Sequence, residues 1–217
     1  MKFVIRRILD FIFPIYCLGC RKQGCHLCSS CIDTIPSCKE QVQEYIFPVF
    51  DYRNTLIKQA IWKLKYRNKK EIATDLAQIV YDRLLEELSE LEMFENFVSP
   101  ILIPIPLSNK RLKERGYNQA ELIAQEIIKK STDNSLTLIK NVLYKIKDTK
   151  SQMEIRDRKK RLQNLRGAFA VKNPELINGR NIILFDDVTT TGATLNEAKK
   201  VLEKAGARKV IGFTVAH

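Results

Sequence analysis

The sequence predicts an α/β fold: an open parallel sheet flanked by helices, with a small cysteine-rich module at the N-terminus. Two observations lead to this class. Strand-like and helix-like segments alternate through residues 99–217, which is typical of a parallel sheet with helical crossovers. All six cysteines fall between Cys17 and Cys38. We therefore expect a helix and cysteine module over residues 1–44 and an α/β domain over residues 45–217.

Hydrophobic spacing and helix-breaking residues define the expected elements of the first half. Residues 1–13 carry apolar side chains at helical spacing, and Pro14 ends that pattern. Residues 45–52 are aromatic and apolar enough for a strand, which a proline within it restricts to the edge of the sheet. Residues 54–95 are expected to be helical, with a division near the basic stretch KLKYRNKK.

The second half supplies the remaining strands and helices. Residues 99–107 predict a buried strand that breaks into a basic loop at two prolines. Asn118, with Glu121 three residues later, predicts the start of a helix that runs to Lys130. A weaker segment lies near residues 136–143. The last elements are a strand at 180–185, a helix at 194–204 and a strand at 208–215.

The composition narrows the class of protein. With 45% hydrophobic and 29% charged residues, the chain matches a folded globular protein, and neither disorder nor membrane residence is indicated. The formal net charge of +12 favours a polyanionic or phosphorylated partner, although a generally basic surface explains it equally well. The N-terminus lacks the apolar run of a signal peptide, and no segment has the apolar length of a membrane span, so we expect a cytoplasmic protein.

The clustered cysteines indicate a metal site, because disulfides are rare in a reducing compartment. Cys17 and Cys20 have the Cys-x-x-Cys spacing that lets two thiolates bind one tetrahedral zinc ion. The second pair is ambiguous from spacing alone, because Cys25, Cys28 and Cys31 form two overlapping pairs. Four thiolates leave no open coordination position, so the expected zinc is structural. The residues that the spacing leaves as substitute ligands are Cys25, His26 and Cys38.

An acidic pair and a threonine loop follow the apolar stretch 182–185 in IILFDDVTTTGATL. The apolar stretch predicts a central strand, and ligands of open α/β sheets bind at the carboxyl ends of such strands. Threonine hydroxyls and free backbone N–H groups at a helix N-terminus suit a phosphate, and Gly192 permits a tight backbone. Asp186 and Asp187 would repel that phosphate unless they accept hydrogen bonds from sugar hydroxyls. A ribose 5-phosphate satisfies both requirements; the alternative is a simple turn followed by a helix cap.

Two basic segments supply cations. The first is the loop after residues 99–107, where Lys113 and Arg115 precede the capped helix and Arg115 could bind a phosphate bidentately. The second is the run RDRKKRLQNLRGAF, whose charge density suits a diphosphate or a polynucleotide backbone. For each segment the alternative is a solvated charged face. The candidate nucleic-acid-binding residues of the second run are Arg156, Arg158, Lys159, Lys160, Arg161 and Arg166.

The stretch IILFDDVTTTGATL resembles the fingerprint of type I phosphoribosyltransferases. The resemblance implies a type I phosphoribosyltransferase-like sheet that binds 5-phosphoribosyl 1-diphosphate (PRPP), with Mg²⁺ held largely by the diphosphate. It implies that Asp186 and Asp187 form the catalytic acidic pair that holds the ribose. Thr190 stands where purine-salvage members carry an acid, which disfavours a purine acceptor. The implied phosphate loop is Thr189, Thr190, Thr191, Gly192, Ala193 and Thr194.

Four segments in order resemble the ComF family of competence proteins: the cysteine module, IWKLKYRNKKEIATDLA, IPIPLSNKRLKERGYNQAELIA, and SQMEIRDRKKRLQNLRGAF with IILFDDVTTTGATL. LCSSC resembles the second cysteine pair of this family, which selects Cys28 and Cys31 as zinc ligands beside Cys17 and Cys20. The resemblance implies action on single-stranded DNA during uptake of transforming DNA, on the cytoplasmic side, with a helicase-like partner.

Three functions are consistent with these residues. The first is a ComF-like competence protein that binds PRPP, or a related 5-phosphate, and single-stranded DNA. The second is an active phosphoribosyltransferase, a glycosyltransferase whose acceptor the sequence does not identify. The third is a nucleic-acid-binding module with a vestigial PRPP site, which the intact DDVTTTGAT motif disfavours.

Overall fold

The structure is a computed structural model of the chain, and it describes residues 14–38, 42–131, 135–147 and 165–217. The helix expected over residues 1–13 lies outside these ranges, and so does most of the second basic run. Only Arg166 of that run's candidate residues is described.

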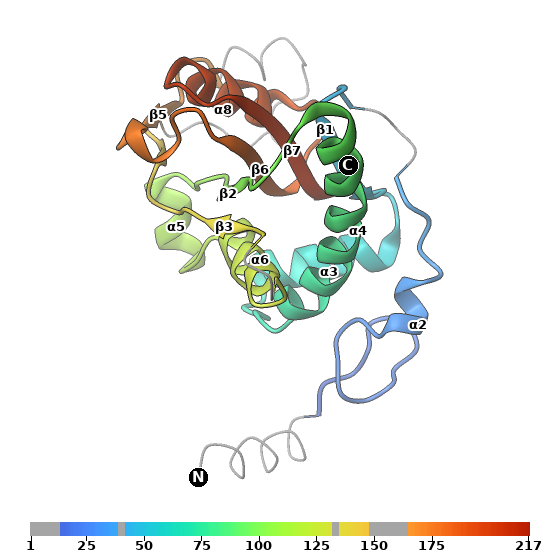
Figure 1. Cartoon of the computed structure of the whole chain (residues 1–217). Helices are drawn as coiled ribbons and strands as arrows, with labels where there is room; N and C mark the ends of the chain where they lie inside the picture. Colours follow the sequence, from blue (N-terminus) through green and yellow to red (C-terminus); the bar gives the residue numbers. More distant parts are fainter. Residues whose placement is uncertain (1–13, 39–41, 132–134, 148–164) are drawn as a thin grey trace, which may run out of the picture.

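The main body is built on a five-stranded sheet whose strand order is β1-β7-β6-β2-β3 (Figure 1). Every neighbouring pair in this sheet is parallel, which confirms the predicted architecture. A second, two-stranded antiparallel sheet pairs β4 (Leu143–Lys145) with β5 (Phe169–Val171). The strands of the main sheet are β1 (Ile46–Phe50), β2 (Ile101–Pro104), β3 (Thr137–Leu138), β6 (Asn181–Val188) and β7 (Lys209–Ala216).

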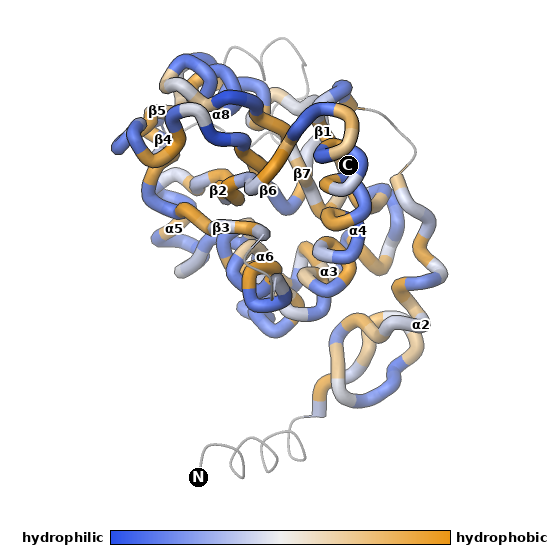
Figure 2. The backbone as a smooth tube through the Cα atoms, in the orientation of Figure 1, coloured by the Kyte–Doolittle hydropathy of each residue, from blue (hydrophilic) through white to orange (hydrophobic). Residues whose placement is uncertain are grey.

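Strand β6 lies in the middle of the sheet because its apolar residues are buried on both faces. Ile183 and Phe185 pack in one apolar cluster with helices α3 (Thr55–Tyr66), α4 (Ile72–Glu95) and α6 (Gln119–Ile128). Ile182 and Leu184 pack in a second cluster with helix α8 (Ala193–Lys204) and the two-stranded sheet of β4 and β5. Pro48 lies in β1 at one edge of the sheet, as predicted. In Figure 2 the hydrophobic segments converge on these strands between the two helical layers.

The structure differs from the expectation at the first basic segment, which is helical. Helix α5 (Asn109–Arg115) begins after Ser108, whose Oγ accepts a hydrogen bond from the Arg111 N–H at 3.4 Å. It ends at Gly116, which adopts the left-handed conformation with φ of 78°. The helix has no buried residue and therefore no apolar periodicity from which to predict it. Asn118 does cap the next helix, α6, by accepting from the Ala120 N–H at 3.1 Å.

The cysteine module packs directly on the main body. It contains helix α2 (Ser29–Ile32), and its Leu27, Ile32 and Ile35 are part of the same apolar cluster as α3 and α4. Asp75 of α4 accepts hydrogen bonds from the N–H groups of His26 and Leu27 at 2.8 and 3.0 Å. The remaining short element is the 3₁₀ helix η1 (Pro174–Leu176). No helix among the described residues combines the length and the hydropathy that a membrane span requires.

Candidate functional site

A cavity opens at the carboxyl ends of β2 and β6, between α3, α5 and the loop before α8. It brings together five of the residues predicted from sequence: Asp186, Asp187, Thr190, Thr194 and Arg115. Because the strands are parallel, their carboxyl ends meet at one edge of the sheet, where ligands of such folds bind. Further polar residues also line the cavity. Arg111 belongs to the first basic segment, and the sequence did not single out the others for this site: Tyr52, Lys65, Tyr66, Asn118, Gln119 and Lys145.

The acidic pair lies within the last residues of β6 rather than after it. Successive side chains of a strand point to opposite faces, so the two carboxylates reach the cavity from different sides. Asp187 lies on the face of α3, where Lys65 Nζ contacts its Oδ1 at 2.8 Å, and both side chains are largely buried. Asp186 Oδ1 accepts a hydrogen bond from the Asp187 N–H at 2.8 Å. Each carboxylate can still accept a hydrogen bond from a ligand on its other oxygen.

Asp186 has a strongly perturbed ionisation. Burial, followed by the negative charge of Asp187, raises the pKa of Asp186 to about 7. The positive charges of Lys65 and Lys145 act in the opposite direction and do not cancel the shift. A carboxyl group poised near neutrality at the end of a central strand is typical of a functional site.

The threonine loop joins β6 to the N-terminus of α8. Thr189 is buried, and its N–H donates to the Ala216 carbonyl at 3.0 Å. Gly192 precedes α8 with φ of +72°, and a Cβ added there would lie 2.8 Å from Ile46 Cδ1. Among the described residues, the buried Thr191 Oγ1 has no hydrogen-bond partner. A side chain at position 192 would require Ile46 and Gln43 to shift, so the loop lies close against β1. Its backbone is at the N-terminus of α8, an arrangement suited to a phosphate.

Cationic side chains come from three elements around the cavity: α3, which carries Lys65, and α5 and β4. Arg115 at the end of α5 donates to Gln119 Oε1 at 2.9 Å and to Tyr66 Oη at 3.4 Å. Arg111 is one turn earlier on the same helix, and Lys145 is at the end of β4. Lys113, predicted to act with Arg115, is exposed and is not among the residues that line this cavity. A helix explains the difference, because residues two apart on a helix point to different sides.

The second basic run is described only at its end. Arg156, Arg158, Lys159, Lys160 and Arg161 lie outside the described residues, so their predicted role stays a prediction. The Arg166 carbonyl accepts a hydrogen bond from Lys147 Nζ at 3.1 Å, so a lysine lies next to Arg166.

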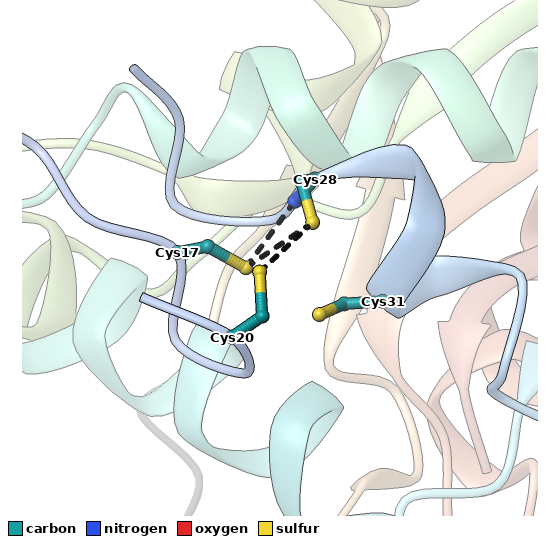
Figure 3. Close-up of side chains that lie close together, drawn as sticks. All are labelled: Cys17, Cys20, Cys28 and Cys31. Carbon is teal, nitrogen blue, oxygen red and sulfur yellow. Dashed lines mark hydrogen bonds between the residues drawn. The ribbon is translucent and has the colours of Figure 1, made fainter. Parts of the chain in front are cut away.

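The four cysteines selected from sequence form one cluster. The Sγ atoms of Cys17, Cys20, Cys28 and Cys31 all lie within 4.8 Å of one another (Figure 3). Cys28 Sγ lies 3.6 Å from Cys17 Sγ and 3.5 Å from Cys20 Sγ. Four sulfurs at about 2.3 Å from one tetrahedral zinc would be separated by about 3.8 Å, so the cluster fits this ion. Among the described residues, the cluster includes none of the substitutes Cys25, His26 and Cys38.

Backbone groups favour the thiolate form of Cys17. Burial of the Cys17 thiol opposes ionisation, but hydrogen bonds from the backbone of Cys28, Cys20 and Gly19 lower its pKa to about 6. A Cβ added at Gly19 would lie 2.7 Å from Cys31 Sγ. The chain therefore needs glycine between Cys17 and Cys20, where this segment contacts the second cysteine pair. Four cysteine sulfurs around one ion leave no open coordination position, which indicates a structural zinc site.

The fold and the two sites define a phosphoribosyltransferase-fold domain with an N-terminal cysteine cluster. Residues 112–217 match the family described as phosphoribosyl transferase domain. Over 216 residues the chain is 32% identical to competence protein F of Haemophilus influenzae, covering 89% of this chain and 86% of that protein. The chain therefore belongs to the competence protein F family, known as ComF.

Other relatives carry related names. Competence protein ComFC of Bacillus subtilis is 34% identical over 170 residues, which cover 77% of this chain but only 62% of that protein. DNA utilization protein YhgH of Escherichia coli K12 is 28% identical over 183 residues, with 84% of this chain and 74% of that protein covered. Among solved structures, a hypoxanthine phosphoribosyltransferase from Staphylococcus aureus aligns with 65% of this chain and 62% of its own, at 13% identity and a TM-score of 0.38. A similarity of that size says nothing about the substrate.

Proposed function

We propose that this protein binds PRPP with Mg²⁺ and single-stranded DNA, and acts in the cytoplasm on DNA taken up during natural transformation. Three relatives support the second half of this proposal, because their names refer to competence or to DNA utilization. The first half depends on one observation. The acidic pair, two threonines of the loop (Thr190 and Thr194) and Arg115 line one cavity at the carboxyl end of the central strand.

The chemistry of the cavity supports a ribose 5-phosphate with a second anionic group. The loop at the N-terminus of α8 offers backbone N–H groups and threonine hydroxyls to the 5-phosphate. Asp186 and Asp187 each keep an acceptor oxygen for ribose hydroxyls. Arg111, Arg115 and Lys145 supply positive charge for a diphosphate. When bound, Mg²⁺ would neutralise diphosphate oxygens, so the protein itself need not provide a full metal cage.

Calorimetry with PRPP and Mg²⁺ tests the ribose-phosphate proposal. We expect saturable binding by the full chain, and loss of binding in Asp187→Asn, with Asp82→Asn on the exposed side of α4 as a matched control. Absence of binding by the wild-type protein would overturn the proposal, and so would unchanged binding by an Asp186→Asn, Asp187→Asn double variant.

An active phosphoribosyltransferase is the second candidate function. The observation that favours it is a carboxyl group at the site with a pKa raised to about 7, where it could exchange a proton with an acceptor. Release of pyrophosphate from PRPP, screened over nucleobases and amines, separates an enzyme from a binding protein. Thr190 lines the cavity, but its hydroxyl does not ionise near neutral pH, so purines are expected to be inactive as acceptors.

We propose that the cysteine cluster binds a structural zinc ion, and measuring the zinc content of the purified protein tests this. We expect one zinc per chain in the wild-type protein and in Cys25→Ser, and a loss of zinc together with thermal stability in Cys28→Ser. Cys25 is a matched control because it lies three residues away and outside the cluster. Full zinc content in Cys28→Ser would contradict the assignment.

The DNA proposal is tested by the salt dependence of binding. Binding that uses phosphate contacts weakens as salt rises, with a slope set by the number of contacts. Neutralising Arg158, Lys160 and Arg161 together should lower this slope if the second basic run contacts the DNA phosphates. An unchanged salt slope would show that this run does not contact the DNA phosphates. A helicase-like partner is part of the same proposal, and pull-down with purified competence helicases tests it.

A further inference from the structure

Helix α3 carries two aromatic side chains that are not part of the hydrophobic core. The helix buries Ile57, Ala60, Ile61 and Leu64, and these residues account for its packing on the main body. Trp62 and Tyr66, one turn apart, are 44% and 53% exposed. Large exposed aromatic side chains that lie next to each other mark interaction sites more often than an isolated exposed ring does.

Each ring is paired with an arginine. The Arg67 guanidinium lies over the Trp62 ring, 5.0 Å from its centroid, and the Arg115 guanidinium lies over the Tyr66 ring at 5.1 Å. The two ring centroids are 6.0 Å apart, with an angle of 48° between the ring planes. These contacts hold both rings in place and put two positive charges beside them. We call these four residues, Trp62, Tyr66, Arg67 and Arg115, the aromatic platform.

The platform is continuous with the candidate PRPP cavity. Tyr66 and Arg115 line that cavity and also a neighbouring surface hollow formed with Asn68 and Tyr117. Lys65 and Arg111 also line this hollow. Lys70 adds a further cation next to it, because its Nζ lies 4.7 Å from the centre of the Tyr117 ring. Glu114 is the acidic residue at this hollow, so basic groups outnumber acids around the two rings.

Aromatic rings beside arginines are the side chains that bind single-stranded nucleic acid without sequence preference. The rings stack on exposed bases, and the guanidinium groups contact the phosphates or stack as well. A duplex keeps its bases stacked inside and offers the rings no free base face. An apolar protein surface is a poorer match, because it would bury several positive charges without partners.

We propose that the aromatic platform stacks successive unpaired bases of a single DNA strand beside the PRPP cavity. The proposal rests on the DNA binding proposed above and adds the place and the recognition chemistry. Trp62 is not among the residues that line the cavity, so two bases of a strand, rather than one free nucleobase in the cavity, fit the pair of rings. The tilt between the rings lets each ring take a separate base.

Fluorescence provides a direct test, because Trp62 is the single tryptophan of the chain. We expect its emission to be quenched when an oligothymidylate binds and to stay unchanged with a duplex of equal length. Anisotropy at fixed salt should show affinities lowered about 5- to 150-fold in Trp62→Ala and in Tyr66→Ala, since stacking contributes about 1–3 kcal/mol per base. Trp62→Phe and Tyr66→Phe should keep most of the affinity.

Two controls test whether a loss of DNA affinity is specific to the aromatic platform. Phe94→Ala removes another exposed ring, 78% exposed near the end of α4, and should leave DNA affinity unchanged. Trp62→Ala should keep the wild-type salt slope, because it removes a stacking contact and no phosphate contact.

Three outcomes would count against the platform. DNA binding by the wild-type protein with no effect of the alanine variants would overturn the platform alone. No binding of any single strand by the wild-type protein would overturn the proposed DNA function as well. Loss of nucleobase-dependent pyrophosphate release in Tyr66→Ala, with DNA affinity intact, would reassign the ring to an acceptor pocket.

Discussion

Lys65 on helix α3 and Asp187 at the end of strand β6 form an ion pair at the candidate site, with Nζ and Oδ1 2.8 Å apart. The side chains are only 16% and 9% exposed, so water screens this pair weakly. The contact fixes one oxygen of Asp187 and leaves the other for a ribose hydroxyl. Helix α3 is thus part of the site, although it lies more than a hundred residues before the acidic pair.

Replacing Lys65 by methionine should destabilise the protein. The change keeps the aliphatic stem and leaves the Asp187 carboxylate buried without its cation, which costs about 3 kcal/mol for a pair of this kind. Urea unfolding measures the difference in the free energy of unfolding. Lys58→Met, at an exposed position of the same helix, should change this free energy by less than about 0.5 kcal/mol. Equal stabilities of the two variants would show that the pair contributes nothing.

Asp186→Asn should stabilise the protein increasingly as the pH rises. The pKa of this carboxyl is raised to about 7, so between pH 4 and 7 the native state holds a proton that the unfolded state releases. Stability from this group is therefore present at low pH and is lost as the pH rises toward 7. The asparagine keeps an acceptor for the Asp187 N–H and carries no charge.

Thermal unfolding of Asp186→Asn and the wild-type protein at two pH values measures this linkage. We expect the difference in Tm to be larger at pH 8 than at pH 5, by on the order of 5 °C. Asp82→Asn, at an exposed position, should show no such dependence. A difference that is constant with pH would mean that Asp186 titrates normally. The same variant should lose PRPP binding, because the amide replaces a ribose acceptor.

The sequence predicts those parts of the fold and site that local patterns encode. The parallel sheet, the edge position of β1 and the central position of β6 follow from apolar runs and Pro48, and the structure confirms them. The cysteine cluster was predicted with the same four residues, because Cys-x-x-Cys spacing is local and the family resemblance selected the second pair. The acidic pair and the threonine loop were predicted from one motif, of which Asp186, Asp187, Thr190 and Thr194 line the cavity. Thr189, Thr191, Gly192 and Ala193 are not among its lining residues.

Features formed between distant segments could not be predicted in this way. Lys65 and Tyr66 sit in a basic amphipathic stretch, and nothing local indicates that this stretch faces Asp187. Helix α5 was missed because it buries no residue and so has no hydrophobic period, although Ser108 and Gly116 are ordinary helix boundary signals. The contact of Asp75 with the cysteine module could not be predicted from sequence, because its partners are the backbone N–H groups of His26 and Leu27.

Asp75→Ala should loosen the cysteine module from helix α4. One carboxylate oxygen of Asp75 accepts from the N–H groups of His26 and Leu27, and burial raises the pKa of this carboxyl. Removing the acceptor leaves two partly buried N–H groups unpaired, at a cost of about 2 kcal/mol. Hydrogen exchange at these two amides should accelerate, and zinc should transfer to a chelator faster. Asp75→Asn, which keeps an acceptor oxygen, should show a smaller effect, and wild-type exchange in Asp75→Ala would contradict the docking role.

Gly192→Ala, compared with Gly179→Ala, isolates the role of the phosphate loop. Both glycines have positive φ, +72° and +68°, so alanine costs about 1 kcal/mol of backbone strain at either position. Only at Gly192 would the new Cβ meet other atoms: Ile46 Cδ1 at 2.8 Å and Gln43 Nε2 at 3.0 Å. The Cβ at Gly179 would meet nothing within 4 Å.

We therefore expect the Gly192 variant to be the less stable of the two and to bind PRPP at least about tenfold more weakly, a loss of about 1.4 kcal/mol. The Gly179 variant should bind PRPP as the wild-type protein does. Equal PRPP affinities in calorimetry would mean that the loop does not need its close approach to β1 to bind the 5-phosphate.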